Sequence, residues 1–167
     1  VQIPAPTPPE MGLKAMQATH RLHVPVADRP SIPQHERDID NYFGTILRDV
    51  GQGAIIDGDT KELVNVLQTG HAVHIFRASG TGRYFYTIGR DGKVTLIDLY
   101  EKEPKVVAET RVCLDARSID VSKYKGPKGD FVDKYALVGC YWPPQMVVLD
   151  GQTLEPLKII STRSSTY

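Results

Sequence analysis

Two histidines three residues apart, His71 and His74, are the side chains of this sequence best suited to bind a metal ion. They lie in the run Gly-His-Ala-Val-His-Ile, at the start of an apolar segment that predicts a strand over Ala72–Arg77. Because side chains on a strand alternate between its two faces, we expect these two on opposite faces and not on one metal ion. A single neutral imidazole suffices as an axial ligand of iron. The residues alone favour the alternative, a hydrogen-bonded structural histidine.

Arginines near the ends of predicted strands form a second group with binding chemistry. A guanidinium binds a carboxylate through two parallel hydrogen bonds, so a cluster at one end of the fold would suit a ligand with several negative charges. The alternative is a set of surface ion pairs, because Asp49, Asp91 and Asp115 lie close by in the sequence, and each arginine taken singly favours that alternative. The group comprises Arg48, Arg77, Arg83, Arg90 and Arg117.

An aromatic pair, Tyr141 and Trp142, stands at the end of a predicted strand and is followed by two prolines. Either ring would offer a stacking face or a polar group to a planar ligand. Packing between sheets is the alternative, and for Trp142, the only tryptophan, we favour it.

The two cysteines, Cys113 and Cys140, are too far apart for a CxxC motif, and no CxxCH motif for attaching a c-type haem is present. They would form one disulfide in an oxidising compartment. We favour the other interpretation, two small buried apolar side chains.

The bulk composition excludes two classes of partner. The 20 basic and 20 acidic residues give a net charge of zero, so nucleic acid is an unexpected partner. No apolar run approaches the roughly 20 residues that a membrane-spanning helix needs, so we expect no membrane. Because the sequence starts at Val1 without a signal segment, we expect a processed or truncated N-terminus.

The elements that must position these residues are strands. Four prolines in residues 1–9 predict an extended tail, and residues 10–23 predict a short helix. From Tyr42 onward, short β-rich runs alternate with turns such as DGDT and DGQT. The expected strands are Tyr42–Leu47, Gly53–Asp57, Leu63–Gln68, Ala72–Arg77, Tyr84–Ile88, Val94–Leu99, Val106–Val112, Ser118–Val121, Tyr135–Cys140, Met146–Leu149 and Leu157–Ser161.

A weak repeat favours a β-propeller over a β-sandwich. Three apolar runs end in an aspartate, Asp57, Asp98 or Asp150, and each is followed by a polar turn and a returning strand. Their spacing, 41 and 52 residues, is close to the roughly 40–50 residues of a propeller blade. The sequence therefore predicts an all-β propeller of which two to three blades are present, against about four to eight in a closed propeller.

Motifs in a fixed order from about Asp28 to the end resemble the cytochrome cd1 nitrite reductase family. The segments that carry the resemblance are DRP (28–30), TILRDVGQGAIIDGDTKELVNVLQTGHAVHI (45–75), GRYFYTIGRDGKVTLIDLYEKEP (82–104), VAETRVCLDARSIDVSKYKG (107–126), YALVGCYWPPQMVVLDGQTLEP (135–156) and STR (161–163).

The resemblance implies an eight-bladed propeller that carries haem d1 on its axis, in a periplasmic homodimer that reduces nitrite to nitric oxide during denitrification. Residues 1–30 would form a tail or linker with a short helix, and residues 31–167 part of the haem d1 propeller domain. Within that domain His74 resembles the proximal axial ligand of the d1 iron. The positions that resemble other haem d1 contacts are Arg48, Arg90 and Arg117, which would bind anionic substituents, together with Ser118, Tyr141 and Arg77.

Other features that the resemblance implies lie outside this sequence. The full enzyme would hold haem c, for which no CxxCH is present here, and two distal histidines are expected beyond Tyr167, so we expect no certain catalytic residue in this chain. The implied partners are the rest of the propeller and an electron donor, which is a cytochrome c domain, a small c-type cytochrome or a cupredoxin. His71 stands where the family usually has an aromatic residue. Alternative functions are haem d1 biosynthesis or transport on the same propeller, and a cofactor-free scaffold that binds protein.

Overall fold

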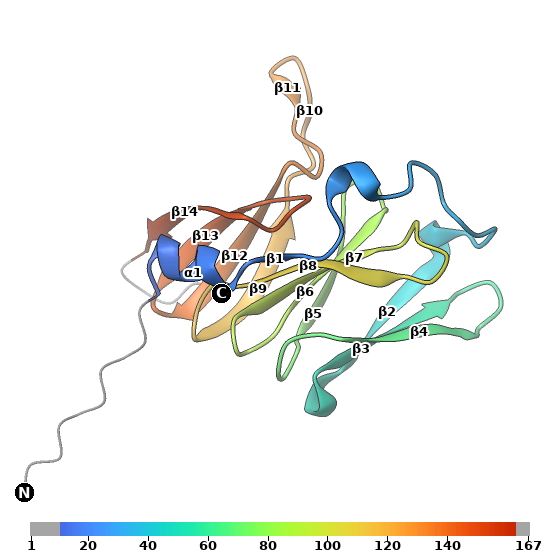
Figure 1. Ribbon diagram of the computed structural model, residues 1–167, viewed down its shortest axis with the longest axis horizontal. Helices are drawn as coiled ribbons and strands as arrows, with labels where there is room; N and C mark the ends of the chain where they lie inside the picture. The colour runs from blue at the N-terminus through green and yellow to red at the C-terminus, as the bar shows by residue number, and fades with distance from the viewer. Residues whose placement is uncertain (1–10, 163–167) are drawn as a thin grey trace, which may run out of the picture.

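The computed structural model describes residues 11–162, and nearly all its regular structure is antiparallel β-sheet (Figure 1). The prediction of an all-β fold with part of a propeller is confirmed. One helix, α1 (Leu13–Thr19), precedes the strands, and short 3-10 turns cover Val26–Asp28, Ile39–Asn41 and Arg48–Val50. The strands are β1 (Arg21–Leu22), β2 (Tyr42–Leu47), β3 (Gln52–Asp57), β4 (Leu63–Gln68), β5 (Ile75–Ala78), β6 (Tyr84–Ile88), β7 (Lys93–Asp98), β8 (Lys105–Arg111), β9 (Asp115–Val121), β10 (Lys125–Gly126), β11 (Gly129–Asp130), β12 (Tyr135–Trp142), β13 (Gln145–Asp150) and β14 (Pro156–Ser161).

Three sheets follow one another along the chain. The first has the order β2-β3-β4, the second β1-β8-β7-β6-β5, and the third β14-β13-β12-β9. Strand β5 of the second sheet contacts β2 of the first and β9 of the third, so the sheets stand next to each other as blades do. A small hairpin, β10-β11, projects from the third sheet (Figure 1). The expected number of two to three blades agrees with these three sheets.

The repeated aspartates end equivalent strands, β3, β7 and β13. The carboxylate of Asp57 accepts hydrogen bonds from the backbone amides of Asp59 and Thr60, and that of Asp150 accepts them from Gln152 and Thr153. Asp98 likewise accepts one from the amide of Tyr100. An aspartate that accepts a hydrogen bond from the backbone amide two residues later stabilises a turn through local contacts alone. For this reason the repeat could be recognised in the sequence.

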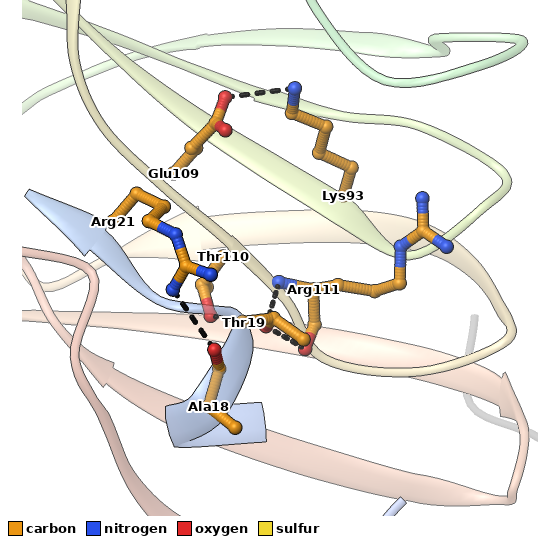
Figure 2. Close-up of a pocket in the computed structure, with 7 residues that line it drawn as sticks. All are labelled: Ala18, Thr19, Arg21, Lys93, Glu109, Thr110 and Arg111. Atoms are coloured by element: carbon orange, nitrogen blue, oxygen red, sulfur yellow. Dashed lines mark hydrogen bonds and ion pairs between the residues drawn. The ribbon is translucent and has the colours of Figure 1, made fainter. Parts of the chain in front are cut away.

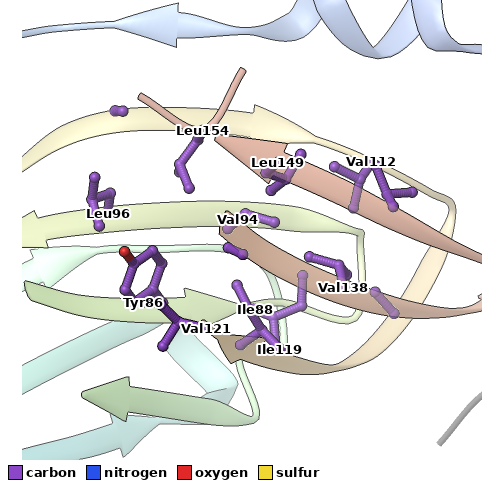
Figure 3. Packing of buried hydrophobic residues seen from close by; sticks show 14 of the residues in the cluster. Tyr86, Ile88, Val94, Leu96, Val112, Ile119, Val121, Val138, Leu149 and Leu154 are labelled. Atoms are coloured by element: carbon purple, nitrogen blue, oxygen red, sulfur yellow. The ribbon is translucent and has the colours of Figure 1, made fainter. Parts of the chain in front are cut away.

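Apolar cores fill the two spaces between the sheets. The larger core lies between the second and third sheets and includes Tyr86, Leu96, Val138 and Leu149 (Figure 3). Buried Tyr86 also donates a hydrogen bond of 2.5 Å to the carbonyl oxygen of Gly151, in the β13–β14 turn. Both the packing and this bond hold the second sheet against the third.

The smaller core joins the first sheet to the second. Phe76 on β5 lies against Gly44 and Gly53, where any added Cβ would collide with its ring. The Phe76 ring also meets Phe85 edge to face, with centroids 5.6 Å apart. Glycines on β2 and β3 therefore make room for one aromatic ring from the neighbouring blade.

The segment before the first sheet packs on the outer parts of the second and third sheets. The expected helix over residues 10–23 is shorter, at Leu13–Thr19, and its Met16 is fully buried. The side-chain amide of Gln17 donates to the carbonyl oxygen of Pro156, and β1 pairs with β8. The division between residues 1–30 and 31–167 stays a prediction, and the tail expected over residues 1–9 lies outside the described residues. No helix among residues 11–162 is long and apolar enough to cross a membrane.

The strand expected over Ala72–Arg77 is wrong at its start. Strand β5 begins only at Ile75, because Ala72 adopts a left-handed backbone with a φ of 46° that interrupts any strand. His71 and His74 both precede the strand, so the expected alternation across its two faces does not apply to them.

Candidate functional site

The segment Thr69–His74 carries both histidines and crosses from the first sheet to the second. At its start, the backbone amide and the hydroxyl of Thr69 both donate to the carbonyl oxygen of Gly51, at 2.9 and 3.0 Å. Gly70 then passes so close to Gly89 that an added Cβ would lie 2.9 Å from the Gly89 Cα. The backbone amide of His74 donates to the carbonyl oxygen of Ile88 at 3.0 Å. Contacts with both sheets thus fix the place of His74.

One nitrogen of the His74 ring has no hydrogen-bond partner in the described part of the chain. Its Nε2 atom is buried and has no hydrogen-bond partner among residues 11–162. Burial lowers the pKa of His74, and the positive charges of Arg117, Arg48 and Arg90 lower it further, while Asp115 opposes them. The lowered pKa favours the neutral imidazole, which is the form that ligates metals. His71, in contrast, is exposed.

The three arginines that act on His74 come from all three sheets. Arg48 follows β2, Arg90 follows β6, and Arg117 lies on β9. Arg48 pairs only with exposed Asp49, at 3.4 Å, and Arg117 has no hydrogen bond or ion pair from its side chain within the described part of the chain. Arginines from three sheets thus act on the imidazole with positive charge, an arrangement that suits a metal-containing group with negatively charged substituents.

Arg77, also expected at the site, points to the neighbouring strand. Its Nε donates to the carbonyl oxygen of Ile119 on β9, at 3.3 Å, and lies 3.8 Å from the carboxylate of Asp120. The structure thus uses Arg77 to join β5 to β9.

Asp115 also belongs to this candidate site, although from the sequence we expected it only in a surface ion pair. Its two carboxylate oxygens accept hydrogen bonds from Nε and Nη2 of Arg90, both at 2.6 Å. Hydrogen bonding to Asp115 raises the pKa of Arg90. The available signal was its place in the run Asp-Ala-Arg-Ser, two residues before Arg117.

Tyr141 lies beside this ion pair, whereas Trp142 does not pack between the described sheets. The Tyr141 ring centroid is 5.9 Å from the Cζ of Arg90. Trp142 is 56% exposed among residues 11–162, so it does not pack between the three described sheets, and packing against a further blade stays a prediction. Pro143 and Pro144 form the turn between β12 and β13, and the peptide bond between Trp142 and Pro143 is cis. Ser118, on β9, stands opposite Gly139 of β12.

The cysteines are joined, contrary to the interpretation that we favoured. Cys113 and Cys140 form a disulfide across 27 residues of sequence. Cys113 precedes β9 and Cys140 lies on β12, and both side chains are fully buried in the larger core. The pairing was not predictable because it depends on how the chain brings β12 beside β9.

A separate pocket of about 380 Å³ lies at the outer edge of the second sheet, among β1, β7, β8 and the end of α1 (Figure 2). Its cations already have partners: Lys93 pairs with Glu109 at 2.8 Å, and Arg21 donates to the carbonyl oxygens of Ala18 and His20. Arg111 pairs with Asp91 at 3.0 Å. The pocket therefore offers little free charge to a ligand, unlike the surroundings of His74.

Comparison with known proteins shows the family to which the chain is similar. The model of a family described as "Cytochrome D1 heme domain" matches residues 37–167. A nitrite reductase of Stutzerimonas stutzeri is 48% identical over 159 residues, which are 95% of this chain and 28% of that protein. A dihydro-heme d1 dehydrogenase of Pseudomonas aeruginosa is 33% identical over 93% of this chain and 30% of that protein.

Among solved structures, a dihydro-heme d1 dehydrogenase, NirN, in complex with DHE superposes with a TM-score of 0.81 and 34% identity. The alignment covers 95% of this chain and 32% of that protein. The chain thus spans about three tenths of the length of these relatives.

Proposed function

The chain belongs to the cytochrome D1 heme domain family, and on that premise we propose that it binds haem d1 with His74 as the proximal axial ligand of the iron. The observation that carries this proposal is the buried Nε2 of His74, which lacks a partner within residues 11–162. A buried polar atom without a partner is costly, and one in a native structure calls for an explanation such as an ion that binds it. The iron of haem d1 would supply that partner.

The surroundings of His74 fit the rest of such a group. Arg117, Arg48 and Arg90 together would bind its negatively charged substituents. Tyr141, beside Arg90, would offer a ring face or a phenolic hydroxyl. Ser118 and Arg77 remain proposed contacts on β9 and β5, and for Arg77 its bond to Ile119 would first have to open.

We propose further that the complete protein is a nitrite reductase that forms nitric oxide. In this reaction nitrite takes up one electron and two protons and yields nitric oxide and water. Bound haem d1 would supply the redox-active iron, and the residues of this chain would hold it from the proximal side. Support comes from the 48% identity to a nitrite reductase, against 33% to the dehydrogenase. We also propose that two histidines beyond Tyr167 donate the protons, and that haem c and a separate electron donor supply the electron.

The cell compartment and the assembly complete this proposal. A disulfide such as Cys113–Cys140 persists in oxidising compartments. It therefore supports a periplasmic protein, where denitrification with nitrite as substrate would take place. A homodimer is proposed from the resemblance alone.

A second candidate function is the oxidation of a haem d1 precursor. The superposition on the dihydro-heme d1 dehydrogenase in complex with DHE favours it, because the two chains align with a TM-score of 0.81. One experiment separates the two candidates: the full-length protein is loaded with haem d1 and assayed for nitric oxide from nitrite, and is assayed in parallel for oxidation of dihydro-haem d1. We expect nitric oxide formation as the dominant activity. Oxidation of the precursor without nitric oxide formation would transfer the assignment to the dehydrogenase.

A further inference from the structure

The ion pair of Arg90 with Asp115 has a geometry that leaves part of the guanidinium free. Asp115 occupies Nε and Nη2 with its two oxygens, both at 2.6 Å. A guanidinium carries five N–H donors in a rigid plane, so the Nη1 edge stays available to another acceptor. Because a planar fork held along one edge cannot rotate freely, Asp115 determines the direction in which that second edge points.

Asp115 itself is anchored on several sides. The backbone amide of Leu114, one residue earlier, donates to the carbonyl oxygen of Trp142 at 3.0 Å, and Asp115 pairs with Trp142 across the β9–β12 ladder. The disulfide from Cys113 to Cys140 ties the same two strands together two residues before Asp115. The carboxylate thus stands on a backbone that is fixed covalently and by hydrogen bonds.

Arg90 is anchored with equal firmness, and its anchor leads to the histidine segment. Its backbone amide donates to the carbonyl oxygen of His71 at 2.8 Å, and its carbonyl oxygen accepts from the amide of Ala116 at 3.2 Å. Both partners of the ion pair therefore have fixed backbones, Arg90 in the turn between β6 and β7 and Asp115 on β9. The remaining freedom lies in the Arg90 side chain, which Asp115 restrains.

We propose that Asp115 is a positioning residue: it holds Arg90 by its Nε and Nη2 edge and so keeps the Nη1 edge available to a negatively charged substituent of the group bound at His74. The inference rests on the proposed haem d1 site and deepens it. It assigns to Asp115 a role through Arg90 and no contact with the ligand. A purely structural ion pair between two sheets would support the fold but would not affect the ligand through Arg90.

The test is haem d1 binding to the full-length protein, followed by its absorption in the red. Asp115→Asn keeps the shape of the side chain and removes its charge. We expect roughly ten- to a hundredfold weaker binding, the range typical for residues that orient a metal ligand. Asp115→Glu, which retains a carboxylate, should recover most of that loss. The matched control is Asp130→Asn, which breaks the 3.1 Å ion pair with Lys125 on the projecting hairpin and should leave binding unchanged.

A double substitution separates positioning from structure. If Asp115 acts through Arg90, adding Asp115→Asn to Arg90→Gln should cause no further loss of affinity. Unchanged binding by Asp115→Asn, or a loss that adds in full to that of Arg90→Gln, would overturn the inference while leaving the proposed function in place. Failure of the unsubstituted protein to bind haem d1 would overturn both.

Discussion

The backbone amide of Arg90 donates a hydrogen bond to the carbonyl oxygen of His71 over 2.8 Å. This bond joins the loop after β6 to the segment that carries His74 before β5. The bond from the His74 amide to Ile88, at the end of β6, fixes the same segment. The imidazole is therefore placed by single hydrogen bonds to the end of β6 and to the loop that follows it. The position of His74 is therefore expected to depend on its neighbours in both adjacent sheets.

The first prediction concerns pH. Burial and three arginines lower the pKa of His74 in the folded protein below its ordinary value of 6.5, so between these two values the unfolded chain binds more protons than the folded one. The stability that neutral His74 contributes is present above pH 6.5 and is lost as the pH falls. We expect the free energy of unfolding of the ligand-free protein, measured by urea titration, to decrease more steeply below pH 6.5 than in His74→Gln. Identical pH profiles would contradict this.

The second prediction concerns Arg117, whose charge acts on His74 more strongly than that of Arg48 or Arg90. Arg117→Gln should raise the pKa of His74, as read from the imidazole signals in NMR spectra of the ligand-free protein. It should also weaken haem d1 binding about tenfold or more, because hydrogen bonds to charged groups contribute about 1.5–3 kcal/mol. Arg21→Gln, which removes an arginine on β1 at the outer edge of the second sheet, is the control and should change neither quantity. Equal effects of both substitutions would argue against a local role for Arg117.

The third prediction concerns the disulfide. Cys113 and Cys140 close a loop with a sequence separation of 27, and a crosslink over such a loop stabilises by about 3–4 kcal/mol through the unfolded chain. Reduction, or the double substitution to serine, should lower the free energy of unfolding by that amount. Denaturant unfolding with and without a reducing agent measures it, and the serine variant should no longer respond to the reductant. A parent protein indifferent to reduction would show that the pair is not oxidised.

The fourth prediction concerns packing between the first and second sheets. Gly53→Ala should destabilise the protein by about 1–3 kcal/mol, because the new methyl group meets the Phe76 ring. In a Phe76→Leu background, whose shorter side chain leaves space, the same substitution should cost less. Thermal unfolding of the four proteins measures this coupling, and strictly additive costs would contradict the contact.

Local features of the fold were predictable from the sequence, and contacts between distant segments were not. The turns after Asp57, Asp98 and Asp150 depend on hydrogen bonds to residues two or three positions on, so the pattern was visible in the chain. The left-handed backbone at Ala72 was not predictable, because alanine does not favour that conformation.

The candidate site divides in the same way. His74 and the arginines were recognisable by residue type and by resemblance. The disulfide and the ion pair of Asp115 with Arg90 were not recognisable. The disulfide depends on the pairing of β9 with β12, and the ion pair depends on the contact of β9 with the loop after β6. The motif around Arg77 predicted a place beside the ligand. Only the fold shows that its side chain donates a hydrogen bond to Ile119 on β9.

The most direct measurement is the absorption spectrum of the full-length protein with haem d1 after substitution of each histidine of the Thr69–His74 segment. His74→Gly should lose or shift the spectrum of the ligated iron, and added imidazole should restore it by filling the vacated position. His71→Gly, which removes an exposed ring three residues away, should keep the parent spectrum. A parent-like spectrum for His74→Gly without imidazole would contradict the assignment of His74 as the axial ligand.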